Sequence, residues 1–299
     1  MKKHSIHMEV KNRKALIWSA ILTGSYFVFE LIAGLIINSI AIISDAFHTF
    51  SAVGGVLIAL IAAHYATKHP TERRTFGFFR AEIFGAFVNG VLLIGMAVLI
   101  MWMGYKRLKN PISIPPIPML MIAGGGLITE IISLRMLFGG QKTNLNMKGA
   151  FWHVVETFIG SLVIIIAAIV IKFSSFYAID PILGMGFGVV LFWASYSIIK
   201  DSVNILLQAT PKGIDLKKIK EEIDSLPYVK ETHHIHAWTL TSGKNIFTAH
   251  VLVEDIKKAD KIIEEINKIL REKYNFYFTT IQIEDKYIAE EPLKIDYIR

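Results

Sequence analysis

Long uninterrupted runs of apolar residues occupy the first two thirds of the chain. A helix needs about 20 predominantly apolar residues to cross the hydrocarbon core of a bilayer. Six runs reach this length, at approximately residues 15–37, 41–64, 81–105, 117–138, 149–172 and 179–206. The pattern therefore predicts a membrane α-helical protein in which residues 15–207 form six transmembrane helices, preceded by a polar tail at residues 1–14.

The pattern changes after residue 207, where charged residues become frequent and the apolar runs become short. Apolar residues recur at helical spacing over residues 212–226 and 257–274. Strand-like composition occurs at residues 228–240, 245–253 and 276–284, and the first two segments are joined by a turn at 241–244. The order predicts a small two-layer αββαβ domain, α+β in class, over residues 208–299. Because so short a segment builds only a modest core, we expect this domain to dimerise.

The composition supports a membrane protein and excludes several other classes. Hydrophobic residues make up 53% of the 299 residues, charged residues 19%, and the mean hydropathy is +0.46, which is too apolar for an ordinary soluble domain. The net charge of +7 comes largely from basic residues at the ends of the apolar runs, where anionic lipid and membrane topology explain them. We therefore do not expect nucleic-acid binding. The chain has no cysteine, so a transition-metal site must use histidine, carboxylate and carbonyl ligands.

Basic residues also predict the orientation of the chain in the bilayer. An even number of spans puts both termini on one side of the membrane. Basic residues on that side are Lys2, Lys3, Lys11, Arg13, Lys14, Lys68, Arg73, Arg74, Arg80, Arg135, Lys142 and Lys148, against Lys106, Arg107, Lys109 and Lys172 on the other. Since Lys and Arg are enriched in cytoplasmic loops, we expect a multi-pass protein of the cell membrane whose N- and C-termini are both cytoplasmic.

Ionisable residues inside two predicted spans are the strongest indication of function, because charged groups in hydrocarbon are costly and rarely present without a role. Asp45 and His48 lie three residues apart in the second span, and His153 and Glu156 do so in the fifth. Each pair therefore occupies one face of a helix. Two such faces opposite each other would form a metal site. A hydrogen-bonded core histidine is the alternative for either imidazole alone, and the repetition on two helices counts against it.

Three histidines lie close together in the first predicted strand of the C-terminal domain. Successive side chains of a strand point to opposite faces of the sheet. Strict alternation therefore puts His234 and His236 on one face and His233 on the other.

Further motifs accompany these residues along nearly the whole chain. They are Asp45-Ala-Phe-His48, Arg80-Ala-Glu82 with Asn89, the segment 144–153 that ends at His153, Asp180-Pro181, and His233-His-Ile-His236-Ala-Trp238. Together they resemble the cation diffusion facilitator family, in its zinc-transporter-type branch. The resemblance implies a homodimeric six-span secondary transporter, not an enzyme, that exports divalent cations, usually zinc, in exchange for protons. It also implies a cytoplasmic αββαβ domain with a metallochaperone-like fold.

The chain departs from this family pattern at the expected transport site. The zinc-type pattern is His-x-x-x-Asp on both the second and the fifth span, but here Ala52 follows His48 and Thr157 follows His153 at that spacing. Both site carboxylates are therefore missing. Two neutral histidines alone would leave the double charge of Zn²⁺ uncompensated in a medium of low dielectric constant.

Other acidic residues are candidates to supply this missing charge. Glu130 lies on the fourth predicted span, and Glu156 lies one position before the usual aspartate. Asp45 is expected to hydrogen bond to His48 or Glu130 and to orient it. The predicted residues of the transport site are thus His48, His153, Asp45, Glu130 and Glu156.

The same resemblance implies a regulatory metal site in the C-terminal domain. His233 and His250 correspond to metal-binding positions of the family, with Glu284 or Asp285 as the carboxylate, and ordinary surface histidines are the alternative. The resemblance also assigns Glu30 and Glu82 to recurrent polar positions that hold membrane helices together or line the cytoplasmic entrance.

We compare four functions with these observations. We favour a secondary transporter that exchanges a divalent metal for protons, with zinc expected and iron, manganese, cobalt, cadmium or nickel as alternatives. A non-transporting membrane metal sensor or partner subunit is the alternative that Ala52 and Thr157 support. An intramembrane metallohydrolase would need paired metal ligands and a base on one helix, which the sequence does not contain. A proton-coupled exporter of organic cations built around Glu130 would transport without metal.

Overall fold

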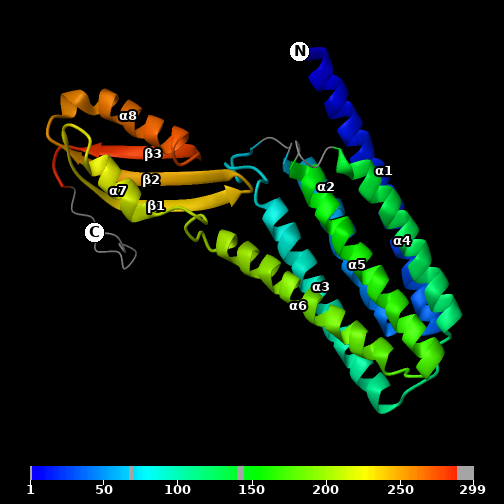
Figure 1. Ribbon diagram of the computed structural model, residues 1–299. Coiled ribbons are helices and arrows are strands. Elements are labelled where there is room, and N and C mark those ends of the chain that lie inside the picture. The colour runs from blue at the N-terminus through cyan, green and yellow to red at the C-terminus, as the bar shows by residue number, and fades with distance from the viewer. Residues whose placement is uncertain (1, 67–69, 140–144, 288–299) are drawn as a thin grey trace. The chain divides into compact units, whose positions relative to one another are not determined.

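Six long helices and a small domain with three strands make up the computed structural model of the chain (Figure 1). The structure describes residues 2–66, 70–139 and 145–287. Their side chains are described as well, except those of residues 2–13, 52–60, 62–64, 66, 145–147 and 149. The long helices are α1 (Lys2–Ile37), α2 (Ile40–Ala66), α3 (Ala81–Lys109), α4 (Pro116–Phe138), α5 (Leu145–Ser174) and α6 (Ile179–Leu206). Contacts divide the chain into two units, one with the residues up to 61 and residues 86–199, and the other with residues 62–85 and those from 200 onwards.

Within the part of the chain that the structure describes, five of the long helices are long and apolar enough to cross a membrane, over Lys14–Ile37, Ala81–Lys109, Pro116–Phe138, Ala150–Ser174 and Ile179–Leu206. The remaining helix, α2, has a comparable length of 27 residues. Large apolar side chains such as Ile36 and Phe173, which are 74% and 81% exposed, face outwards as lipid-facing residues do. The prediction of a helical, multi-pass membrane domain is confirmed.

Helices α1, α4 and α5 pack against one another. Small and branched residues fill the core beside them, among them Ala41, Ile42, Ala123, Ile164 and Ala168. Small residues allow membrane helices to approach closely, since hydrophobicity does not drive their association in lipid. The close approach of α1 and α2 at their turn also requires a small residue, because a β-carbon on Gly34 would lie 2.9 Å from the side chain of Ile42.

Asp180 ties the first turn of α6 to the first turn of α2. Its Oδ1 accepts a hydrogen bond from the Ser39 hydroxyl at 2.5 Å, and its two oxygens accept the backbone N–H groups of Ile40 at 2.8 Å and Ala41 at 3.2 Å. These N–H groups have no partner within α2, because they lie in its first turn. A buried carboxylate from a distant part of the sequence therefore caps α2 and holds in place the helix that carries Asp45 and His48.

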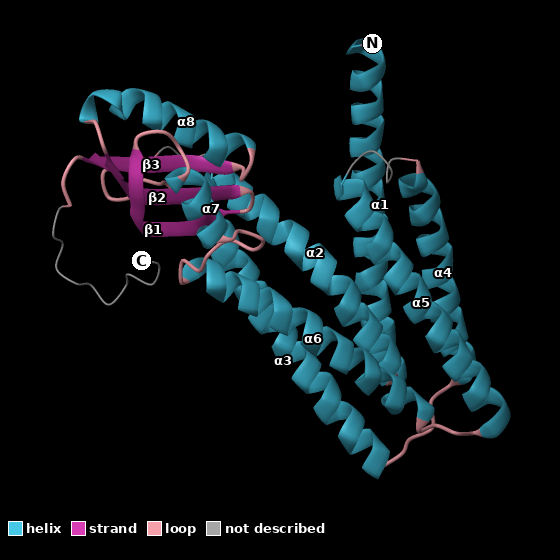
Figure 2. Ribbon diagram, turned by 60° about the vertical axis from the view of Figure 1, so that its left-hand side comes forward, coloured by secondary structure: helices cyan, strands magenta, loops and turns pink. Residues whose placement is uncertain are grey.

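The C-terminal domain contains α7 (Leu216–Asp224), β1 (Val229–Thr241), β2 (Lys244–Val253), the short 3₁₀ helix η1 (Ile256–Lys258), α8 (Ala259–Glu272) and β3 (Phe276–Glu284). The sheet order is β1-β2-β3, with β1 and β2 antiparallel and β2 and β3 parallel. Figure 2 shows the three strands side by side with both helices beside them. The predicted αββαβ order is confirmed.

One face of this sheet forms a core with the two helices. Ile219 and Ile223 of α7 and Ile266 of α8 pack on Phe247 and Val251 of β2, and all five are fully buried. The other face, which carries His233 and His250, is only half-buried.

The first helix of the domain is shorter than the sequence pattern predicts. It begins at Leu216 because the carboxylate of Asp215 accepts the backbone N–H groups of Lys217 and Lys218, at 3.1 and 3.4 Å, which is the geometry of an N-cap. Residues 212–215 therefore precede the helix.

Glu82, at the start of α3, contacts the turn between β1 and β2 within the second unit. Its carboxylate accepts hydrogen bonds from Thr241 Oγ1 at 2.5 Å and Ser242 Oγ at 2.8 Å. The ammonium group of Lys244 lies 3.9 Å from the ring centroid of Phe79, which precedes α3. Of the two roles expected for Glu82, joining membrane helices is not the one its hydrogen bonds show, because these partners belong to the C-terminal domain; lining of the cytoplasmic entrance stays a prediction.

Candidate metal sites

The structure brings together three of the five residues predicted for the transport site. His48 on α2 and His153 on α5 have ring centroids 5.6 Å apart. Glu156 Oε2 lies 3.8 Å from His48 Nε2 and 4.0 Å from His153 Nδ1, and one ligand atom from each residue lies within 4.8 Å of the others. We call this group the membrane triad.

Helix geometry explains how α5 supplies two members of the membrane triad. His153 and Glu156 are three residues apart and so lie on neighbouring positions of one helix face. His48 and His153 are mostly buried, whereas the Glu156 side chain is 62% exposed. His153 Nε2 is buried with no hydrogen-bond partner among the described residues. Two imidazoles and one carboxylate are a suitable donor set for Zn²⁺ and related divalent ions, with an open position for a further ligand.

Asp45 and Glu130 do not belong to this group of ligand atoms. Glu130 Oε1 accepts a hydrogen bond from Ser161 Oγ at 3.0 Å, and Asp45 lies against Gly160 of α5. Glu30 of α1 is within hydrogen-bonding reach of Asp45. Of the two substitutes considered for the missing aspartates, the described structure brings only Glu156 to the two histidines.

The two positions that lack the family aspartate differ in what the structure describes. Thr157 is buried, and its hydroxyl donates to the Val154 carbonyl at 3.0 Å. Ala52 belongs to α2, but its side chain lies outside the described residues.

A second group of histidines and a carboxylate lies on the half-buried face of the C-terminal sheet. His233 of β1 and His250 of β2 are directly opposite in the register. Glu284, at the end of β3, places Oε1 2.9 Å from His250 Nδ1 and Oε2 3.4 Å from His233 Nε2, and its side chain is 0% exposed. Their ligand atoms lie within 4.8 Å of one another. We call this group the sheet triad.

Asp285, the alternative to Glu284, is exposed just after β3 and does not belong to the sheet triad. Another aromatic side chain, that of Tyr287, stacks on His233 with ring centroids 5.0 Å apart. The sequence contains no pattern that would have indicated this contact, because Tyr287 follows the last strand.

The prediction of strict alternation along β1 is wrong. The register shifts between the pairs His233↔His250 and His236↔Thr248, and His234 has a φ of +51°. Three steps in β1 therefore match two steps in β2, as in a β-bulge. His233 and His236 share a face because their partners are two residues apart. The ring of His234 stacks on that of His250, with centroids 4.9 Å apart.

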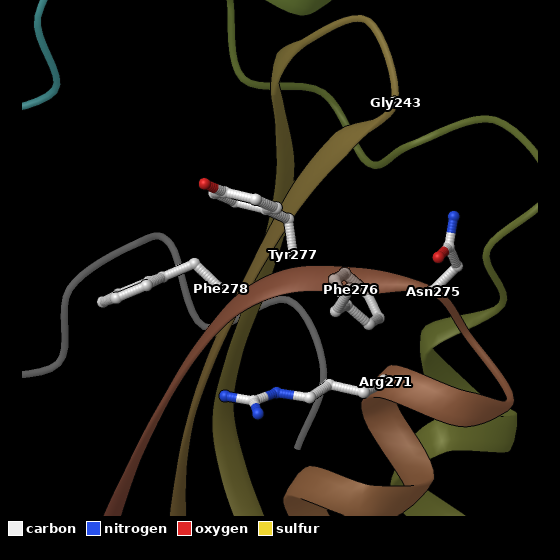
Figure 3. Close-up of a pocket in the computed structure, with 6 residues that line it drawn as sticks. All are labelled: Gly243, Arg271, Asn275, Phe276, Tyr277 and Phe278. Carbon is white, nitrogen blue, oxygen red and sulfur yellow. The ribbon is translucent and has the colours of Figure 1, made fainter.

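A separate hollow in the C-terminal domain does not have the chemistry of a metal site. Figure 3 shows Arg271 of α8, Asn275 and three aromatic residues of β3 around it, near Gly243 in the β1–β2 turn. These lining residues offer no imidazole and no carboxylate. The candidate metal chemistry of the described residues is thus concentrated in the two triads.

Comparisons with known proteins agree with these features. The transmembrane domain of the cation efflux family matches residues 16–207, and the cytoplasmic domain of cation efflux proteins matches residues 211–286. Among curated relatives, the metal cation efflux system protein CzcD of Cupriavidus metallidurans is 35% identical over 274 residues, which cover 91% of this chain and 87% of the relative.

Two further relatives have similar coverage. The cadmium, cobalt and zinc/H(+)-K(+) antiporter of Bacillus subtilis is 34% identical over 93% of this chain and 91% of its own length. The zinc transporter ZitB of Escherichia coli is 31% identical over 92% of this chain and 88% of its own length. With both domains matched in order, the chain belongs to the cation efflux, or cation diffusion facilitator, family, which consists of transporters and not enzymes.

Proposed function

We propose that this protein is a secondary active transporter that exports a divalent metal cation, with zinc as the first candidate, from the cytoplasm in exchange for protons. The observation that carries the proposal is the membrane triad, since two imidazoles and a carboxylate from α2 and α5 lie within ligand distance inside membrane helices. The names of the relatives support it, because they refer to zinc transport, to metal cation efflux and to antiport of cadmium, cobalt and zinc against H⁺ and K⁺.

The chemistry of the membrane triad accounts for exchange with protons. Imidazole binds a metal only when the ligating nitrogen is unprotonated, so a metal ion and a proton compete for His48 and His153. A pH gradient that protonates the site from the extracytoplasmic side would therefore drive release of the metal there. Glu156 supplies one negative charge to the ion, in place of the aspartates that the family pattern has at positions 52 and 157.

We further propose a homodimer in the cell membrane, with the tail at residues 1–14 and the domain at 208–299 in the cytoplasm and residues 15–207 in the bilayer. The sheet triad would bind a regulatory divalent ion, since Glu284 lies between two imidazoles with no exposure to solvent. The half-buried histidine-bearing face of the sheet is the surface on which we expect the two C-terminal domains to meet.

The test is zinc flux in proteoliposomes that contain the full-length protein, with an indicator for zinc and one for pH in the lumen. We expect zinc uptake that increases with an outward proton gradient and that is abolished by His153→Ala. The matched control His236→Ala removes a histidine that belongs to neither triad and should retain uptake. Tight zinc binding by the membrane triad without any flux would instead favour the non-transporting metal sensor, for which the uncharged Thr157 is the supporting observation.

A further inference from the structure

Besides Asp180, which caps α2, three carboxyl groups outside the membrane triad are buried among the described residues of the membrane domain. Glu30 on α1, Asp45 on α2 and Glu130 on α4 are 3%, 2% and 8% exposed. Among the described residues, none of them forms an ion pair with a lysine or an arginine. Three ionised carboxylates without a cation would cost several kcal/mol each in such a place.

Glu30 and Asp45 lie within hydrogen-bonding reach of each other. An ionised carboxylate has only acceptors, so a hydrogen bond between two carboxyl groups requires that at least one of them carries a proton. Two carboxyl groups in this arrangement titrate as a unit, because ionisation of one makes ionisation of the other more costly.

The surroundings supply few other hydrogen-bond donors to these acids. The Tyr26 hydroxyl donates to the Ile122 carbonyl, and the Thr157 hydroxyl donates to the Val154 carbonyl. Ser161 Oγ donates to the cluster, at 3.0 Å from Glu130 Oε1, and Thr157 is within hydrogen-bonding reach of the same carboxyl. Asp45 Oδ1 and Glu130 Oε2 are buried with no partner among the described residues. A proton on one of these acids can donate to a neighbouring carboxyl oxygen, which would satisfy such an oxygen.

The space for this cluster depends on a glycine. A β-carbon on Gly160 of α5 would collide with Asp45 Oδ1 and lie 3.2 Å from Asp45 Cγ. Asp45 therefore reaches the surface of α5 next to Ser161, which binds Glu130. Asp45 of α2 and Glu130 of α4 therefore both contact α5, at the adjacent residues Gly160 and Ser161.

This carboxyl cluster adjoins the membrane triad without sharing its atoms. Asp45 precedes His48 by three residues, or about 4.5 Å of helix rise. Glu130 lies within hydrogen-bonding reach of Thr157, the residue after Glu156. The other titratable groups around the cluster are Tyr26 on α1, His48 on α2, and His153 and Glu156 on α5. Asp180 of α6 is occupied at the start of α2.

We propose that the Glu30–Asp45 pair, together with Glu130, is a proton-binding site separate from the membrane triad, and that it releases a proton when a divalent ion occupies that triad. The first half stands on the geometry of the carboxyl cluster, and the second half rests on the proposed transport function. A divalent ion bound by two neutral imidazoles and the Glu156 carboxylate leaves one net positive charge. Loss of one proton from the neighbouring cluster adds one negative charge and neutralises it, so the two events favour each other.

Infrared spectroscopy of the metal-free wild-type protein in lipid vesicles tests the proton site directly, because a protonated carboxyl has a C=O stretch that a carboxylate lacks. We expect a buried protonated-carboxyl band at neutral pH that is reduced or lost in Glu30→Gln and in Asp45→Asn. The control Glu82→Gln removes a carboxylate that binds Thr241 and Ser242, and it should leave the band unchanged. A wild-type protein without this band at neutral pH would overturn the proposal, whether or not the variants fold.

Calorimetric titration with zinc in two buffers of different ionisation enthalpy tests the link to the metal. We expect Glu30→Gln and Asp45→Asn to bind zinc and to release about one proton fewer per ion than the wild type and Glu82→Gln. Equal proton release in all four proteins would overturn the link. If the wild type neither binds nor transports zinc, the proposed function fails, and the infrared measurement still decides whether the proton site exists.

Discussion

The membrane triad and the sheet triad contain the same donors, two imidazoles and one glutamate, but hold them in different ways. In the sheet triad the register of β1 and β2 puts His233 opposite His250, and Glu284 lies 2.9 and 3.4 Å from them with no exposed side-chain surface. In the membrane triad the glutamate is 62% exposed and lies 3.8 and 4.0 Å from the histidines.

This difference matches the roles proposed for the two sites. Strands joined by a ladder of hydrogen bonds keep neighbouring side chains at a constant spacing, which suits an ion that stays bound and supports the fold. The contact between α2 and α5 is made by side chains, so a relative movement of the helices separates the ligands and lets the ion leave. An exposed glutamate suits an ion that binds and then leaves. A glutamate buried between two imidazoles suits an ion that stays bound.

Removal of one histidine from each triad should produce the largest contrast. We expect His48→Ala to reduce zinc flux by more than about 100-fold, since a ligand matters at least as much as the residues that orient it. His250→Ala should lower the amount of zinc bound per chain and leave most of the flux. Flux in proteoliposomes and metal content of the purified proteins check this. A loss of flux in His250→Ala as complete as in His48→Ala would show that the sheet triad is part of the transport path.

Removal of the glutamate should weaken zinc binding more at the sheet triad than at the membrane triad. Glu284→Gln leaves two imidazoles around a buried neutral amide, and we expect the affinity of the sheet triad to fall by about 10- to 100-fold. Glu156→Gln should weaken the membrane triad by less than about 10-fold, because water can replace an exposed carboxylate. Zinc titration of the full-length protein by calorimetry separates the two. Asp285→Asn is the control, and if it weakened binding as much as Glu284→Gln, the assignment of the ligand would be wrong.

Restoring the family carboxylates should bring the membrane triad closer to the sheet triad in affinity. Thr157→Asp, alone or with Ala52→Asp, places a charge four residues after its histidine, and we expect zinc affinity to rise by about tenfold, or about 1.4 kcal/mol. Thr157→Asn has the same shape without the charge and serves as control. If calorimetry detects no tighter binding in the double variant, side chains at positions 52 and 157 do not face the metal.

The smallest effect is expected at a solvent-exposed contact of the C-terminal domain, between Glu222 of α7 and the residues that follow α8. Hydrogen bonds from Lys273 and Tyr274 to Glu222 lower the pKa of that carboxyl. Because the folded-state pKa is below the unfolded one, the contribution to stability is present above the ordinary glutamate pKa and is lost as pH falls through the lowered value.

Glu222→Gln should therefore reduce the free energy of unfolding of the C-terminal domain by about 0–1 kcal/mol at neutral pH. The difference from wild type should disappear at acidic pH. This difference in stability is measured by thermal unfolding of the full-length protein at several pH values, in which the unfolding of the C-terminal domain is monitored. Exposed Glu264→Gln on α8 is the control, and an effect of equal size there would rule out a specific role for Lys273 and Tyr274.

The membrane site shows where prediction from the sequence succeeded and where it could not succeed. The spacing of His153 and Glu156 on one helix correctly indicated a shared face, because helix geometry is local. The choice between Glu130 and Glu156 depended on how α4 and α5 are rotated against each other, which packing determines. Glu130 instead receives a hydrogen bond from Ser161, and Asp45 lies beside Glu30, a residue of a different helix.

The sheet triad shows the same limit in a strand. The composition of residues 228–240 correctly predicted β1, but an extra residue near His234 shifts the register and brings His233 and His236, which were predicted on opposite faces, onto one face. A bulge depends on pairing with another strand, so the period of one strand cannot reveal it. Glu284 and Asp285 were equal candidates for the same reason.

The sequence alone determined the helical membrane domain, the αββαβ order and the residue types available to a metal, because hydrophobic period, length and composition are properties of contiguous segments. Only the tertiary structure decided which ionisable groups meet. It separated the acids of α1, α2 and α4 from the two membrane histidines, and it joined β1, β2 and β3 at the sheet triad. The physical reason is that burial makes the cost of a charge depend on its partners, and those partners come from segments far apart in the chain.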